Sequence, residues 1–341
     1  MVLDPQAFRT WKPGPDPYAE SGVTLKLDDL PPRWEGNIRL TYMMSTWNRS
    51  AQLARSLEML ARQEWREFEV LLNDDGSTED IEYLVKMFEP HLNIRYYYSE
   101  RTSWISCASK AFKRMLLDAQ GEVVAIAHPE MMLHPAAMWY LYHGVVGILP
   151  DAAVNAMQAA PEGAHTGWRW VSLKPVFIQE DYYHLLDEID WHSDIENLLS
   201  DARIARSAGF AGRDNLWHAN QTAYPWWFVA AAHRTCPIWD GIPAIKGHGI
   251  FDMWLVAVRC RWGFDDIIPD QPMCYHQPHL TSALAPRGEQ DDPRLSPDLL
   301  ADAFHATKAA QLRQLASARK ELKQKPMAAQ KIRAAFGRAG D

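Results

Sequence analysis

Short apolar runs and amphipathic segments alternate along residues 38–127. Each run is rich in branched or aromatic residues and is followed by polar or turn-forming residues, as strands are. Each segment between two runs repeats its apolar residues at helical spacing, for example at Leu53, Leu57 and Leu60. The pattern therefore predicts strands at residues 38–44, 68–73, 93–99 and 122–127, separated by helices at residues 50–63, 78–90 and 103–121.

Strands and helices that alternate in this way form parallel sheets, because each helix carries the chain back across the sheet by a right-handed crossover. We therefore expect an α/β fold with a mostly parallel sheet flanked by helices. In such sheets ligands bind beyond the carboxyl ends of the strands. The turns after the first, second and fourth strands should therefore line one crevice, and they read STWNR, DDGST and HPEMM.

The alternation divides the chain into four parts. Residues 1–36 are rich in Pro, Gly and Asp and should form an irregular arm on the outside, ahead of the regular half at 37–150. Residues 151–285 lose the rhythm and hold many of the 15 tryptophans among short polar segments. Residues 286–341 are rich in Ala, Lys and Arg and are expected to be a basic, mostly helical extension.

Composition narrows the class of protein. With 47% hydrophobic and 23% charged residues, the 341-residue chain has the balance of a soluble globular protein. Its formal charge of −8 argues against nucleic acid as the main partner. No apolar run reaches the roughly 18 residues of a membrane span, and no signal peptide pattern opens the chain. Four widely spaced cysteines are then expected to be reduced thiols in a cytoplasmic protein.

Two adjacent carboxylates, Asp74 and Asp75, follow the second predicted strand in the segment EVLLNDDGSTED. One interpretation is a turn and a helix cap, with Ser77 or Thr78 capping a helix from Glu79. The other is a binding edge, where the end of a strand presents carboxylates to a ligand. Both interpretations can hold at once.

These motifs together resemble family 2 glycosyltransferases, enzymes of the GT-A fold that transfer a sugar from a nucleotide-sugar. The segment MSTWNRSAQLARSLEMLARQEWREFEVLLNDDGSTED follows the family pattern almost position for position. AQGEVVAIAHPEMMLHP keeps the frame of the next family block, and GHGIFDMWL and CYHQPH stand at the places of later ones. The similarity covers roughly residues 38–280, and it implies a donor-binding half at 37–150 and an acceptor and catalytic half at 151–285.

The resemblance implies a set of residues for the nucleotide-sugar. Asp75 and Asp74, with Thr46, would bind the nucleoside, since a carboxylate can accept the imide N–H of uracil. Lys110 would pair with the diphosphate. Trp227 and Gly249 would stand near the donor sugar, the first in the wall of the site and the second where the backbone comes close.

The same resemblance places His128-Pro129-Glu130 where family members hold a divalent cation with an Asp-x-Asp triplet. Glu130 aligns with the second acid and His128 replaces the first, while His276, or else His279, would complete the metal shell. Carboxylate with imidazole suits Mn²⁺ at least as well as Mg²⁺, so either ion is the expected cofactor. The alternative is a simple turn, with Pro129 ending the strand.

For catalysis the resemblance implies Asp252, at the start of a helix, as the base that takes the proton of the acceptor hydroxyl. The reaction would be a single displacement with inversion, with UDP as the favoured nucleotide. The acceptor would be a glycan, a protein or a hydroxylated base.

Two alternatives stay open: a non-catalytic nucleotide- or glycan-binding relative, and a transferase that acts on modified DNA bases. The basic C-terminal extension could make a weak membrane or nucleic-acid contact, or could simply be a solvated face.

Overall fold

A computed structural model gives the fold of this protein. It describes residues 23, 25–100, 108–149, 154–157, 168–173, 175–177, 229–240, 242, 265–269 and 273–277. Asp252, Trp227, Gly249 and His279 lie outside the described residues, as does the C-terminal extension. Expectations for these positions therefore stay predictions.

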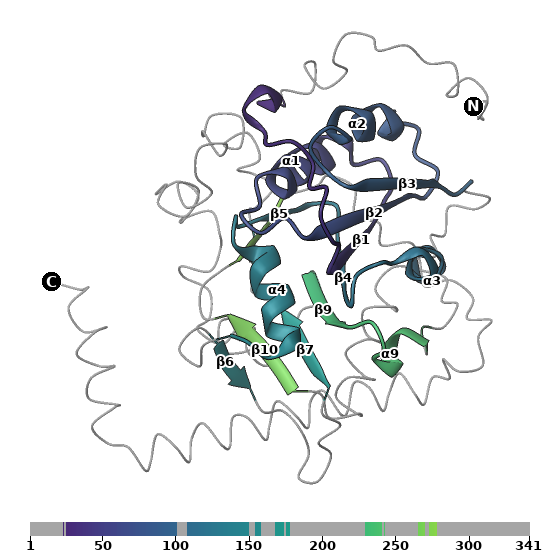
Figure 1. Ribbon diagram of the computed structural model, residues 1–341. Helices are drawn as coiled ribbons and strands as arrows, with labels where there is room; N and C mark the ends of the chain where they lie inside the picture. The colour runs from purple at the N-terminus through teal and green to yellow at the C-terminus, as the bar shows by residue number, and fades with distance from the viewer. Residues whose placement is uncertain are drawn as a thin grey trace, which may run out of the picture.

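Four parallel strands in the order β3-β2-β1-β4 form the first half of the main sheet (Figure 1). They are β1 (Leu40–Thr46), β2 (Phe68–Asp74), β3 (Ile94–Tyr98) and β4 (Val123–Ala127). Their positions agree with the predicted strands to within two residues. The carboxyl ends of β1, β2 and β4 consequently lie along one edge of the sheet.

Four further strands continue the sheet beyond β4. They are β9 (Val229–His233), β7 (Arg169–Ser172), β10 (Asp265–Pro269) and β6 (Val154–Met157). β9 runs antiparallel to both β4 and β7, β10 is parallel to β7, and β6 is antiparallel to β10. The sheet is therefore mixed but mostly parallel, which confirms the predicted fold class.

A second, small sheet has the order β5-β11-β8. It joins β5 (Met131–Leu133), β11 (Cys274–His276) and β8 (Pro175–Phe177), with β11 antiparallel to β5. The sequence predicts only a turn after β4 and does not reveal β5. This sheet brings residues near 275 beside the end of β4.

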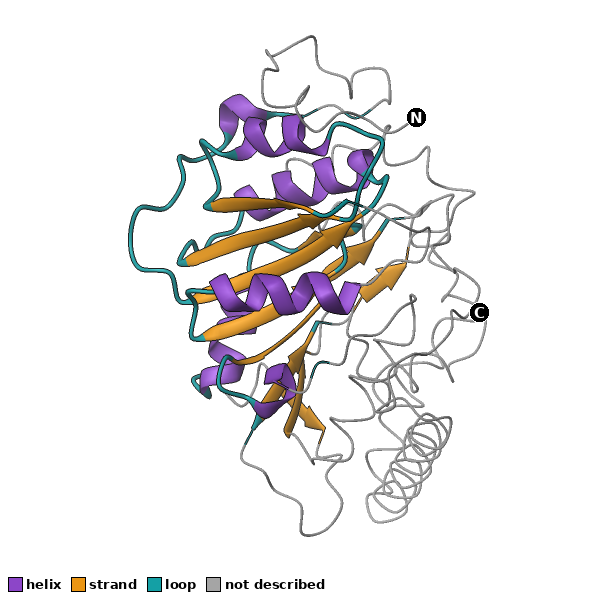
Figure 2. Cartoon of the chain, turned by 90° about the vertical axis from the view of Figure 1, so that its right-hand side faces the viewer, coloured by secondary structure: helices purple, strands orange, loops and turns teal. Residues whose placement is uncertain are grey.

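Helices pack on both faces of the main sheet (Figure 2). α1 (Ser50–Ala61), α2 (Ile81–Phe88) and α4 (Ala137–Val146) share one core cluster. α3 (Ala108–Asp118) and the short α9 (Pro237–Asp240) contribute to the other cluster. The result is a helix–sheet–helix arrangement in which β1 and β4 are buried on both sides.

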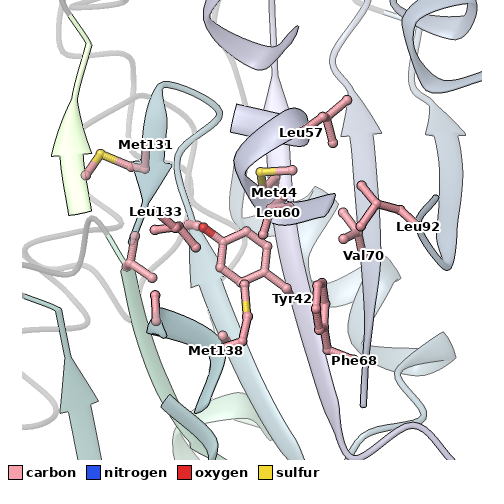
Figure 3. Packing of buried hydrophobic residues seen from close by; sticks show 14 of the residues in the cluster. Tyr42, Met44, Leu57, Leu60, Phe68, Val70, Leu92, Met131, Leu133 and Met138 are labelled. Carbon is pink, nitrogen blue, oxygen red and sulfur yellow. The ribbon is translucent and has the colours of Figure 1, made fainter. Parts of the chain in front are cut away.

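Alternation along β1 explains why two cores form. Tyr42 and Met44 belong to the cluster on the α1 side and Met43 to the cluster on the α3 side, and none is more than 1% exposed. Figure 3 shows Tyr42 within the first cluster, with Leu133 and Met138 near it. Burial of each such side chain is worth about 1.5–3 kcal/mol, so both faces hold this strand in place.

The start of α2 corrects one expectation. Asp80, rather than Ser77 or Thr78, is the N-cap, and its side chain accepts a hydrogen bond from the Tyr83 backbone N–H at 2.9 Å. The helix accordingly begins at Ile81. The expectation was wrong because Ser77 and Thr78 are hydrogen-bonded to the turn that follows β1.

Described parts of the arm and of the tryptophan-rich half supply core residues. Val23 and Leu30 are buried in the cluster on the α1 side, on either side of the short 3₁₀ helix η3 (Leu27–Asp29). Trp170 and Trp239 are each 1% exposed in the other cluster. These two tryptophans are therefore packing residues.

The two described cysteines, Cys236 and Cys274, are buried free thiols, as expected. Across the part of the chain that the structure describes, we find no helix with the length and apolar character needed to cross a bilayer.

Candidate functional site

The candidate site lies at the carboxyl ends of β2, β1 and β4. In register, Thr46 of β1 stands beside Asp74 of β2, and Met44 stands beside Ala127 of β4. Neighbouring strands are about 4.8 Å apart, so the ends of β2 and β4 are separated by roughly 10 Å. Residues that directly follow these strands therefore face the same stretch of the sheet edge.

Asp74 shapes the turn after β2. It is 2% exposed, its Oδ1 accepts the Ser77 backbone N–H at 2.8 Å, and its Oδ2 accepts the Tyr96 hydroxyl at 2.9 Å. Burial raises the pKa of the Asp74 carboxyl, although these two partners act in the opposite direction. Both oxygens thus have partners within the fold, which fits the interpretation of Asp74 as a turn residue.

Asp75 is placed differently. Its backbone N–H donates to the Thr46 carbonyl at 2.9 Å, which continues the pairing of β2 with β1 past the last strand residue. Asp75 is half-buried, and the chain turns away at Gly76 with φ of 76°. Thr46 is itself 2% exposed. Of the two adjacent aspartates, Asp75 is the one at the accessible tip.

The turn after β1 is tied to the turn after β2. Asn48 adopts a left-handed backbone with φ of 50°, a conformation that asparagine tolerates better than most residues. Its backbone N–H donates to Ser77 Oγ at 3.0 Å, and its Oδ1 accepts the Thr78 backbone N–H at 2.8 Å. Glu79 Oε2 accepts the Ser50 backbone N–H at 2.6 Å. The side chains of Asn48, Ser77 and Glu79 thus fix the two strand tips together.

Glu130 lies at the centre of a charged cluster beyond β4. It is 2% exposed, and its Oε2 forms an ion pair with Arg49 Nη1 at 2.6 Å. Its Oε1 lies 3.5 Å from His128 Nδ1 and 3.6 Å from His276 Nε2. These partners come from the start of α1, the turn after β4 and the end of β11. The structure therefore brings together all three of the residues predicted as metal ligands.

The electrostatics of this cluster favour the ionised carboxylate. Burial by itself would raise the pKa of Glu130. The charges of His128 and Arg49 and the hydrogen bond from His276 outweigh burial and hold the pKa well below its ordinary value. Glu130 is consequently a fixed negative charge at the centre of the cluster.

Gln277 anchors the backbone under the cluster. Its backbone N–H donates to the Glu130 carbonyl at 3.1 Å, and its Nε2 donates to the Gln52 carbonyl of α1 at 2.9 Å. Its Oε1 accepts Arg55 Nη1 at 3.4 Å, and Ser56 Oγ donates to the Pro129 carbonyl at 2.7 Å. Helix α1 and the small sheet are therefore joined below Glu130.

The residue types near Glu130 suit a divalent ion, but their placement does not fit one. Among the described residues, no group of three or more His, Cys, Asp or Glu side chains is positioned to hold a metal ion. Arg49 already lies 2.6 Å from one oxygen of Glu130, so a metal ion would share that carboxylate with a guanidinium cation. The three predicted ligands therefore lie close together, but they are not arranged as the ligands of a metal ion.

Lys110 is not placed with the other predicted residues. It is exposed in the first turn of α3, a helix that packs on the opposite face of the sheet from α1. Its role at the diphosphate stays a prediction.

Arg49 and Gln277 are site residues that the sequence analysis did not assign. Both belong to motifs that the sequence displays, STWNR and CYHQPH. A basic residue in the turn after the first predicted strand was the available signal for Arg49. For Gln277 the sequence offered none, because its partners lie on α1, more than 220 positions away.

Comparison with known proteins finds glycosyltransferases that are similar to this region. The family model for glycosyl transferase family 2 matches residues 41–130, which contain β1 to β4 and the cluster up to Glu130. Chondroitin synthase of Escherichia coli is 34% identical over 119 residues, covering 35% of this chain and 17% of that protein. Validoxylamine A glucosyltransferase of Streptomyces hygroscopicus is 41% identical over 63 residues, covering 18% of this chain and 15% of that protein.

The chain thus spans about a sixth of the length of these curated relatives. Among solved structures, Staphylococcus aureus TarS 1-349 in complex with UDP-GlcNAc is 13% identical, covers 80% of this chain and 66% of that chain, and has a TM-score of 0.46. The strand tips that carry Asp75 and Glu130 lie within the matched segment. Residues 41–130 of this chain therefore match the model of glycosyl transferase family 2.

Proposed function

We propose that this protein is a glycosyltransferase that moves a sugar from a nucleoside diphosphate sugar, with UDP as the favoured nucleotide, to an acceptor hydroxyl. The observation that carries the proposal is the convergence of Asp75 and the Glu130 cluster at one edge of the sheet, inside the segment that matches the family. A nucleoside needs hydrogen-bond partners for its base, whereas a diphosphate needs partners for its negative charge. Asp75 suits the first need and Arg49, in the Glu130 cluster, suits the second.

The tip of β2 suits the nucleoside. A half-buried carboxylate at Asp75 can accept a hydrogen bond from an imide N–H such as that of uracil. Thr46 lies beside it through the backbone bond to Asp75, and Trp47, also half-buried, follows Thr46 at the end of β1. Asp74 would act through the turn that it holds.

The end of β4 suits the diphosphate. Arg49, His128 and His276 surround Glu130 just beyond the end of β4. The ends of β4 and β2 are roughly 10 Å apart, which is a separation that a nucleoside with its phosphates can bridge. The leaving diphosphate gains negative charge as the glycosidic bond breaks, and a guanidinium fixed in advance stabilises that charge.

Asp252 is the proposed base. It would take the proton of the acceptor hydroxyl as the hydroxyl oxygen bonds to the anomeric carbon and the bond to the diphosphate breaks. One displacement of this kind inverts the anomeric configuration. The acceptor class, a glycan, a protein or a hydroxylated base, is left to experiment.

A divalent ion, Mn²⁺ or Mg²⁺, held by Glu130, His128 and His276, is the cofactor that the sequence suggests. Because Arg49 already pairs with Glu130, binding of such an ion would require the carboxylate to rearrange.

The second candidate is a nucleotide-binding protein without transfer activity. The ion pair between Arg49 and Glu130 favours it, because that pair engages the acid on which a metal-dependent transferase would rely. Such a protein would bind the nucleotide at the same site as the proposed glycosyltransferase but would not transfer the sugar.

The first experiment is a thermal-shift screen with UDP, GDP, CDP and dTDP, because a ligand that binds only the folded state raises its melting temperature. We expect UDP to give the largest shift. Asp75→Asn should weaken UDP binding about tenfold, the loss expected for one charge-assisted hydrogen bond. Asp29→Asn, an exposed acid in η3, is the matched control and should bind UDP normally.

Turnover then separates the two candidates. With UDP-sugars and a panel of acceptors, the wild-type chain should release UDP and Asp252→Asn should not. Wild-type binding of UDP without turnover of any donor would favour the second candidate. Absence of a melting shift with every nucleotide would contradict both.

A further inference from the structure

The ion pair between Arg49 and Glu130 lies where the proposed donor would place its diphosphate. Arg49 ends the β1–α1 turn as the N-cap residue of α1, and its side chain is only 8% exposed. Glu130 comes from the neighbouring strand end, and its side chain is 3% exposed. A permanent cation is thus buried beside the carboxyl ends of two parallel strands.

The charges around Glu130 do not add up to an acidic metal site. One carboxylate faces one permanent cation and two imidazoles, so the four side chains sum to zero with neutral histidines and to a positive charge otherwise. The N-terminus of α1 adds partial positive charge at the same place. With its one acid offset by a guanidinium, the cluster lacks the net negative charge that would favour a free divalent cation.

The geometry also prepares Arg49 for a phosphate. A guanidinium carries five N–H donors in a planar fork that matches phosphate oxygens in pairs. Glu130 Oε2, 2.6 Å from Arg49 Nη1, fixes the position of that fork beside the strand ends. Low exposure strengthens each such contact, because little water screens it.

We propose that Arg49, oriented by Glu130, binds the diphosphate of the nucleotide-sugar and replaces a divalent metal ion in neutralising it. The inference rests on the proposed function, since it requires a nucleoside diphosphate donor. Glu130 acts here as a positioning residue for Arg49 rather than as a metal ligand. His128 and His276 flank the same carboxylate on its other oxygen.

The test is calorimetric binding of UDP and of uridine to the full chain, once with EDTA and once with Mn²⁺. Wild-type protein should bind UDP in EDTA, and Mn²⁺ should change that affinity by less than about threefold. Arg49→Gln should weaken UDP about tenfold or more and leave uridine binding unchanged, because uridine lacks the diphosphate.

Two further variants guard against a simple loss of folding. Arg49→Gln combined with Glu130→Gln leaves no buried unpaired charge, and it should still bind uridine normally and UDP weakly. Arg62→Gln removes the arginine of the ion pair with Glu58, near the opposite end of α1, and should bind both ligands normally.

Three outcomes would overturn the inference. In the first, EDTA abolishes wild-type UDP binding and Mn²⁺ restores it. In the second, the double variant binds UDP as tightly as wild type, which would make Arg49 a purely structural residue. In the third, wild-type protein binds neither UDP nor uridine under any condition, which removes the proposed function as well.

Discussion

Tyr96 donates its hydroxyl hydrogen to Oδ2 of Asp74 across 2.9 Å, from β3 to the tip of β2. This bond and the Ser77 backbone N–H engage both oxygens of a carboxylate that is almost fully buried. Of two adjacent aspartates, the fold thus uses one to build the turn and places the other at its tip.

Tyr96→Phe should lower the free energy of unfolding by about 1.5 kcal/mol at pH 7, because Asp74 loses a donor to its ionised form. The folded pKa of Asp74 is raised by burial, so its own contribution to stability is present below its unfolded pKa and is lost as pH rises through the folded pKa. Loss of the Tyr96 hydroxyl raises the folded pKa of Asp74 further.

The cost of Tyr96→Phe should therefore shrink as pH falls through the folded pKa of Asp74, where the carboxyl becomes neutral. Urea denaturation of both proteins at several pH values measures it. In an Asp74→Asn background the cost should not vary with pH in this way. If Tyr96→Phe lowered the free energy of unfolding equally at every pH when Asp74 is present, the hydrogen bond from Tyr96 to the ionised Asp74 would be contradicted.

Gln277→Leu should reduce stability by about 1–3 kcal/mol, because the Gln52 carbonyl and its other buried partners lose a hydrogen bond. It should also weaken UDP binding, since the Gln277 side chain helps to hold the backbone below Glu130. Gln63→Leu is the matched control. Gln63 is likewise a buried bridging glutamine, but it lies beyond the C-terminal end of α1.

Gln63→Leu should therefore lower stability by a similar amount and leave the affinity for UDP unchanged. Chemical denaturation and calorimetry on the same preparations measure both quantities. Equal losses of UDP affinity in the two variants would show that Gln277 acts only through global stability.

Gly121→Ala should destabilise the fold by about 1–3 kcal/mol or more through overpacking. An added Cβ would meet the Thr41 backbone nitrogen at 2.5 Å and the Leu40 carbonyl carbon at 2.6 Å, and neither can move without shifting β1. Gly36→Ala is the control, because its Cβ would meet the Trp34 side chain, which is 39% exposed and able to move aside. Thermal unfolding should show a clearly larger loss for Gly121→Ala.

The local pattern predicted the regular half of the fold well. Leu53, Leu57 and Leu60 repeat at helical spacing, and they are buried on the face of α1 that packs on the sheet. Apolar runs such as 122–127 predicted strands buried on both sides, and β4 occupies that position. These successes share one cause, which is that side-chain periodicity along a strand or helix is a property of neighbouring residues.

Prediction of the site was less complete. Glu130, His128 and His276 were expected together and they are together, but the sequence suggested a metal ion where the fold places Arg49. The pattern predicts a helix that reaches Gly121, whereas α3 ends at Asp118 and the glycine lies against β1. For Glu130 and for Gly121 alike, a contact with residues distant in the sequence decides the role.

The sequence by itself determined the order of strands and helices over residues 38–127, the edge at which their polar ends gather, and the match of residues 41–130 to the glycosyl transferase family 2 model. Only the tertiary structure decided that Asp74 supports the turn while Asp75 lies at its tip, and that Glu130 faces a guanidinium. The periodicity of apolar residues indicates which face of a helix or strand is buried, and this periodicity depends only on residues that are neighbours in the sequence. The partner of a buried charge is fixed by packing between elements, for which a single sequence carries no direct signal.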